Sequence, residues 1–158
     1  GRGTFMKTGG LTKAGRLQKL VPGDFVYSRL FAWQGSFGLV PESATPIFAS
    51  NEFPAFEVDT ARVMPEYLAA WFRQPAVWRE VENQCTGSTP GSRNRFKEER
   101  LLSMSVGLPT KQSQYDTVRA LKKLKAIEKA TVRQRLLADA FPKSVRNGVF
   151  ASLAESAR

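Results

Sequence analysis

Histidine is absent from this sequence of 158 residues, cysteine occurs once, and acidic residues are fewer than basic ones, 14 against 24. Without histidine, imidazole acid–base catalysis and most zinc sites are excluded. The single Cys85 excludes an internal disulfide, and no histidine is present to activate it as a nucleophile. No apolar run approaches the roughly 18 residues of a membrane span, and no secretion signal is recognisable. We therefore expect a cytoplasmic protein with no membrane partner, metal, cofactor or catalytic residues.

The excess of basic residues gives a net charge of +10. A charge of this size indicates an anionic partner, which could be nucleic acid, an anionic membrane or an acidic protein. Hydrophobic residues make up 42% of the chain, which is enough to build a core. The length fits one domain, or one domain with an appendage.

The stretch from Gly23 to Val40, GDFVYSRLFAWQGSFGLV, is the most informative part of the chain. A turn signal precedes a run of β-branched and aromatic residues, and two glycines separate it from a second apolar run. The pattern predicts a β-hairpin. Its aromatic residues either form core, or the tip presents Arg29, Trp33 and Gln34 to a polyanion that carries base edges.

Further elements follow from periodicity and from the positions of proline. We predict strands over 47–50 and 53–58, a helix over 65–73 that Gln74-Pro75 interrupts, a second amphipathic turn with Val77, Trp78 and Val81 on its apolar face, a short helix over 96–102 and a strand over 104–108. The predicted fold is α+β: a mixed-sheet domain over 1–110, a long projecting helix over 111–141 and a basic tail over 142–158.

Two segments lack the residues of a core. Residues 1–22 carry basic side chains and no acidic ones. We therefore expect either a solvated arm or an arm that contacts phosphate. Residues 84–95, QCTGSTPGSRNR, predict an exposed loop whose hydroxyls, glycine N–H groups and arginines suit phosphate contacts.

The long helix is predicted from about Gln112 to Phe141, with Pro142 ending it. Apolar and small residues recur every three or four positions, which is typical of a coiled-coil seam. A helix of this length cannot bury one whole face on so small a domain, so we expect it to project and pair with another helix; folding back onto its own domain is the alternative. The seam consists of Ala120, Leu124, Ile127, Thr131, Gln134, Ala138 and Phe141, with Val118, Leu121 and Leu137 on its flanks.

The order of these motifs resembles one known family. The chain has a GDFVYS strand, an AWQGSF turn, SNEF before a strand, a Pro-x-Tyr-Leu helix, a Gly-Ser-x-x-x-x-Arg loop, then VGLP and a long helix containing Gln114. Over roughly Gly1 to Phe150, this series is similar to the DNA specificity subunit of type I restriction-modification systems. Two differences stand out: only one recognition domain is present, and Thr110 stands where the family tends to have proline. We also expect the opening segment of the domain to be missing.

The resemblance implies a non-catalytic subunit in which a target-recognition domain reads half of a split site in double-stranded DNA. Its long helix acts as a spacer, and partner modification and restriction subunits carry out methylation and cleavage. The residues expected to contact DNA are Arg29, Trp33, Gln34, Ser88, Ser92, Arg93, Arg95, Lys97, Lys7 and Lys13. The residues expected to pair helices, in a homodimer or with a modification subunit, are Val118, Leu121, Leu124, Ile127, Thr131, Leu137 and Phe141.

Three other functions stay open. An RNA-binding module is one, because basic charge with aromatic residues also suits stacking on unpaired bases. An adaptor that acts mainly through the long helix is another. An enzyme is the third, although the sequence shows no catalytic triad, metal-ligand cluster or nucleotide-binding glycine motif.

Overall fold

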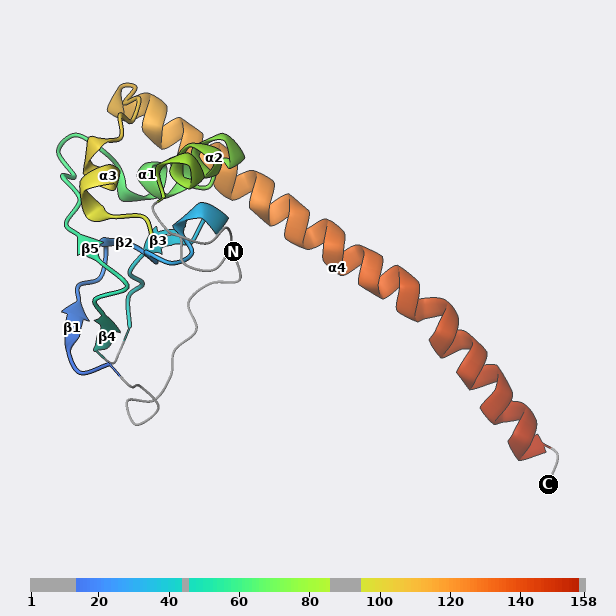
Figure 1. The fold of residues 1–158 in the computed structure, drawn as a ribbon. Helices are drawn as coiled ribbons and strands as arrows, with labels where there is room; N and C mark the ends of the chain where they lie inside the picture. Colours follow the sequence, from blue (N-terminus) through green and yellow to red (C-terminus); the bar gives the residue numbers. More distant parts are fainter. Residues whose placement is uncertain (1–13, 44–45, 86–94, 157–158) are drawn as a thin grey trace. The chain divides into compact units, whose positions relative to one another are not determined.

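The computed structural model describes residues 14–43, 46–85 and 95–156. The chain divides into two units, unit 1 over Gly1–Val118 and unit 2 over Arg119–Arg158. Unit 1 contains both strands and helices, and the predicted α+β class is confirmed (Figure 1).

The predicted hairpin lies at the centre of unit 1. Strands β2 (Phe25–Tyr27) and β3 (Phe37–Leu39) pair antiparallel, with Phe25 opposite Leu39 and Tyr27 opposite Phe37. The strands are shorter than predicted, because the 3-10 helix η2 (Ala32–Gln34) occupies the turn. Strand β5 (Ala55–Phe56) pairs with the other edge of β2, which gives the sheet order β3-β2-β5.

A separate two-stranded ribbon joins β1 (Leu17–Leu20) to β4 (Ile47–Ser50). Strand β4 was predicted, whereas β1 lies in the segment expected to be an arm. Leu17 and Leu20 are three residues apart and so do not alternate as strand residues do. The strand forms because β4 supplies the hydrogen-bonding partner.

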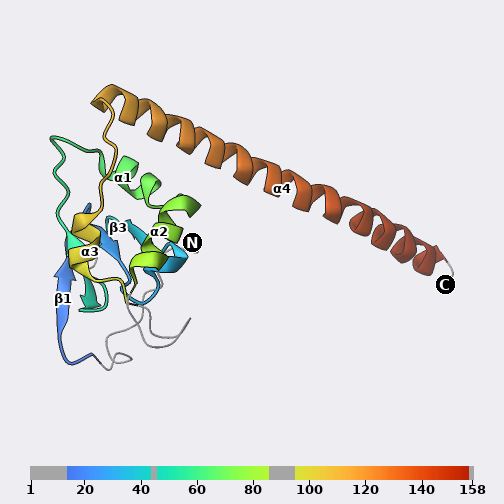
Figure 2. The same ribbon diagram turned by 45° about the horizontal axis from the view of Figure 1, so that its top comes forward.

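All strand pairs in the described residues are antiparallel, so the predicted mixed sheet is wrong. A parallel pair needs a long crossover, usually a helix, between its strands. Here the short helices follow the last strand along the chain. Figures 1 and 2 show α1 and α2 close together, with β1 apart from both of them.

The short helices agree with the sequence patterns. Helices α1 (Pro65–Trp71) and α2 (Pro75–Gln84) each begin on a proline, whose fixed φ suits the first helical turn. Helix α3 (Glu98–Ser103) follows the return of the chain to the sheet.

The predicted strand over 104–108 is wrong, because this segment pairs with no strand among the described residues. Its alternating pattern has another cause. Met104 and Val106 pack against the core, and the Gly107 carbonyl accepts a hydrogen bond of 3.1 Å from the Tyr67 hydroxyl.

Aromatic side chains form the core of unit 1. The Phe72 ring lies 4.9 Å from Phe25 and 4.7 Å from Phe37, measured between ring centroids, and Phe96 meets Tyr27 edge to face. Each such pair contributes about 0.5–1.5 kcal/mol beyond its buried area. The aromatic residues of the two strands are therefore core, which confirms the first of the two interpretations of the hairpin for these residues.

Helix α4 (Lys111–Ser156) begins one residue before its predicted start and continues through Pro142, so the predicted end at Phe141 is wrong. A proline removes one backbone hydrogen bond and bends a helix, but the hydrogen bonds on both sides of it still form. At 1.5 Å per residue, the 46 residues extend over about 70 Å. No helix in the described ranges combines the length and apolar character of a membrane span.

Candidate nucleic-acid interface

The turn of the hairpin has a fixed backbone. The Ser28 N–H donates to the Ser36 carbonyl at 3.0 Å, and the Gly35 N–H donates to Ala32 at 2.8 Å. Gly35 has a φ of +76°, and a Cβ atom there would lie 2.3 Å from the Trp78 ring. Only glycine fits both the left-handed backbone and this close approach.

Two predicted contact residues in this turn differ in exposure. Trp33 is half-buried against the core, and its Nε1–H donates to the Leu30 carbonyl at 3.0 Å. It is therefore a support of the turn rather than an exposed contact residue, and the prediction for Trp33 is corrected. Gln34 is exposed, and its side chain makes no hydrogen bond with any residue that the structure describes.

Arg29 is also corrected. Its guanidinium pairs with the Glu98 carboxylate of α3, and both side chains are partly buried, 23% and 33% exposed. The hydrogen bond with Glu98 raises the pKa of Arg29. Burial alone would raise the pKa of Glu98, but the hydrogen bond with Arg29, a backbone hydrogen bond and the positive charge of Arg29 together outweigh burial and lower that pKa. An arginine engaged in this way is not available to grip a guanine, so we assign Arg29 the role of fixing α3 to the hairpin.

The residues that follow the 86–94 segment are held against the hairpin. The Phe96 N–H donates to the Arg29 carbonyl at 3.0 Å, and the Tyr27 hydroxyl donates to the Phe96 carbonyl at 3.0 Å. Cys85 packs against the same core cluster, and burial raises the pKa of its thiol. Burial likewise raises the pKa of the Tyr27 phenol. At one end of this segment the chain thus packs on the core, and at the other end it is bonded to the hairpin.

Two exposed cations lie at the second of these ends. The Arg95 side chain is 52% exposed and pairs with Glu52 at 2.9 Å. Glu52 is 25% exposed, so the pair is partly buried, and the exposed half of the Arg95 side chain remains accessible to a further anion. Lys97 is exposed at the start of α3 and forms no ion pair within the described ranges.

The other predicted DNA contacts, Ser88, Ser92, Arg93, Lys7 and Lys13, lie outside the described residues. Of the full set, the structure therefore leaves Gln34, Arg95 and Lys97 as exposed candidates, carried by segments that are tied to the aromatic core. We call these three exposed residues together the hairpin–α3 surface.

Most residues predicted to pair helices are exposed on unit 2. Leu124 and Ile127 are each 61% exposed, and Leu121, Thr131 and Leu137 are exposed as well. Val118 is only 5% exposed within unit 1, so its assignment to helix pairing is wrong. The Phe141 side chain lies outside the described set.

Sequence reasoning missed two features of α4. Gln114 was noted only as part of a motif, but it is buried and its side chain makes three hydrogen bonds within unit 1. No local pattern signals such a role for a glutamine. The apolar seam also continues to the exposed Val145 and Val149, and their spacing from Phe141 could have shown this if Pro142 had not been taken as an end.

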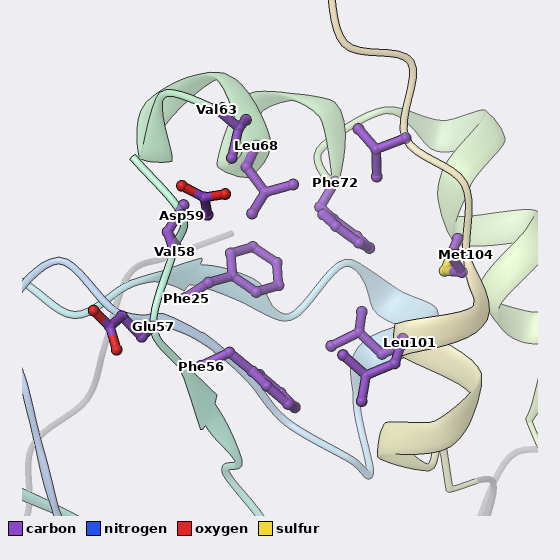
Figure 3. Close-up of a pocket in the computed structure, with 12 residues that line it drawn as sticks. Phe25, Phe56, Glu57, Val58, Asp59, Val63, Leu68, Phe72, Leu101 and Met104 are labelled. Carbon is purple, nitrogen blue, oxygen red and sulfur yellow. The ribbon is translucent and has the colours of Figure 1, made fainter. Parts of the chain in front are cut away.

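An apolar cleft of about 300 Å³ lies elsewhere in unit 1 (Figure 3). It is lined by Phe25, Phe56, Leu68, Phe72, Leu101 and Met104, among others. Glu57 and Asp59 also line it. Carboxylates beside an apolar cleft disfavour phosphate, so this cleft is not part of the candidate interface.

No protein-family model matches this chain, and no curated protein matches it either. The similarity to specificity subunits thus rests on the order of sequence motifs. The described ranges contain no group of three or more Cys, Asp or Glu side chains that could hold a metal ion.

Proposed function

We propose that this chain is a DNA specificity subunit, or half of one, of a type I restriction-modification system. Unit 1 binds one half of a split target in double-stranded DNA without catalysing a reaction. The exposed seam of unit 2 pairs with a second copy of the chain or with a modification subunit. Partner subunits carry out methylation and restriction.

The observation that carries this proposal is the hairpin–α3 surface. Gln34, Arg95 and Lys97 are exposed there, on backbone that Tyr27 and Arg29 tie to the core. Recognition of base edges needs side chains that are held in place on a rigid scaffold. Glutamine can bond adenine with two hydrogen bonds, and arginine or lysine can bond guanine or phosphate.

The test measures duplex DNA binding by the full chain as a function of salt. A randomised duplex pool serves as the probe, and the recovered sequences are read after selection. We expect enrichment of one short motif. Replacement of both Arg95 and Lys97 by alanine should flatten the dependence of log K on log salt by about 1.8, since each lost phosphate contact contributes about 0.9.

The matched control replaces Arg73 and Arg79 by alanine, since both are exposed and the variant loses the same charge. Tryptophan fluorescence confirms that both variants are folded. Equal losses in the two variants, or no enriched motif, would refute specific recognition by the hairpin–α3 surface.

One observation favours the RNA-binding alternative. Phe31 precedes η2 and is 52% exposed, and exposed aromatic rings stack on unpaired bases. Competition between duplex DNA and single-stranded RNA at equal salt separates the two functions. Preference for RNA, with loss of that preference in Phe31→Ala, would support the alternative.

A further inference from the structure

The positive charge of the chain is concentrated in unit 2. Residues 119–158 contain ten basic and three acidic residues, a net charge of +7 in 40 residues. Residues 1–118 contain fourteen basic and eleven acidic residues, a net charge of +3. The hairpin–α3 surface therefore accounts for little of the charge that first indicated an anionic partner.

The basic residues of α4 include a regular row. Lys122, Lys125, Lys129 and Arg133 follow one another at spacings of three, four and four, which places them on one face of a helix. All four are exposed. At 100° per residue, this face lies roughly opposite the seam that contains Leu124 and Ile127. We call these four residues the cationic row.

Two members of the row have no acidic neighbour on the helix. Lys129 and Arg133 have no acidic residue three or four positions away in either direction, and they are themselves four positions apart. Like charges at this spacing repel and destabilise a helix. Polyanion binding would relieve this repulsion, whereas pairing of the opposite seam with another helix would leave the row exposed.

We propose that the cationic row binds the phosphate backbone of the DNA duplex, so that the long helix is a second, sequence-independent DNA contact. This rests on the proposed function, because it takes duplex DNA as the ligand. From Lys122 to Arg133 the row extends over about 16 Å, and a duplex carries one charge per about 1.7 Å of its axis.

A uniformly charged backbone is the partner that fits this row best. The row contains no acidic or aromatic residue, so it offers charge without the hydrogen-bond acceptors or stacking surfaces that read bases. An acidic protein is the other class of partner, and the experiment includes it as an outcome.

The experiment compares two charge-matched variants of the full chain. K129Q/R133Q removes one lysine and one arginine from the row, and K123Q/R135Q removes one of each from other faces of the same helix. Glutamine keeps a good helix propensity. Binding of a random-sequence duplex pool is measured between about 50 and 200 mM salt.

We expect the slope of log K against log salt to fall by about 1.8 in K129Q/R133Q, from two lost phosphate contacts, and to change less in K123Q/R135Q. Equal slopes in the two variants would overturn the inference. The inference would also be overturned if K129Q/R133Q bound duplex DNA as the unaltered chain does but bound poly-glutamate more weakly, because that result would indicate an acidic protein partner.

The same titration separates this inference from the proposed function. If R95A/K97A weakens duplex binding and K129Q/R133Q, the row variant, does not, only the inference fails. If the row variant weakens binding but R95A/K97A has no effect and no motif is enriched, the proposed recognition function fails and the contact by the helix stands. If the unaltered chain binds no duplex DNA, both fail.

Discussion

Replacing Gln114 by alanine tests how the start of α4 is held in unit 1. Its side-chain Oε1 accepts a hydrogen bond from the Met64 N–H at 2.8 Å, and its Nε2 donates to the carbonyls of Pro109 and Arg62 at 2.9 and 3.1 Å. The side chain is 1% exposed. Alanine would leave these three backbone groups without their partner.

Each lost hydrogen bond costs about 0.5–1.5 kcal/mol, and more where the remaining group stays buried. Arg62 and Pro109 are exposed residues, so water can replace part of the loss. We therefore expect the free energy of unfolding of unit 1 to fall by about 2–3 kcal/mol. For a domain of about 100 residues, this lowers Tm by roughly 8–12 °C.

The assay is thermal unfolding followed by tryptophan fluorescence, because all three tryptophans lie in unit 1. Gln112→Ala is the matched control, since Gln112 is exposed on the same helix and bonds only Asp116, at 3.2 Å. It should lower Tm by about 2 °C or less, as expected for an exposed side-chain pair of a few tenths of a kcal/mol. Equal Tm values for the two variants would show that Gln114 does not hold this helix start.

Two further predictions concern the hairpin. Gly35→Ala should destabilise unit 1 by about 2–4 kcal/mol, because of the left-handed backbone and the clash with Trp78. Gly38→Ala is the control and should cost far less, because an added Cβ there meets no atom within 4 Å. Similar Tm values for the two variants would contradict this account of the turn. Because the fold lowers the pKa of Glu98, its contribution to stability is present above the pKa of the unfolded chain, about 4.3, and is lost as pH falls through the folded-state pKa. Chemical denaturation at several pH values should therefore show a shallower acid loss of stability in Glu98→Gln than in Glu99→Gln, and parallel curves would count against the Arg29 pairing.

Local patterns predicted most of the elements of unit 1. Proline indicated the start of the helix at Pro65, and a turn signal followed by β-branched and aromatic residues indicated the hairpin, because each signal depends on residues close in sequence. Strand β1 and the role of Gln114 depend on partners about 30–50 residues away, so no local pattern could reveal them.

The candidate interface was harder to predict, because exposure and charge pairing are properties of the folded chain. The predicted hairpin tip includes Gln34, which is exposed, but the sequence pattern could not show that Glu98 engages Arg29 or that Trp33 supports the turn. Pro142 illustrates a different limit: a local rule indicated an end that the neighbouring hydrogen bonds of α4 override.

Gly35 also bears on how binding preference could be altered in the laboratory. The neighbouring side chains, Gln34 and Ser36, are exposed, while Gly35 itself admits no side chain beside Trp78. A library that randomises positions 34 and 36 but retains the glycine between them should yield mostly folded variants. Under the proposed function, the tip of the hairpin thus offers two variable positions around a required glycine, and such a library is the place to begin changing the DNA sequence that is bound.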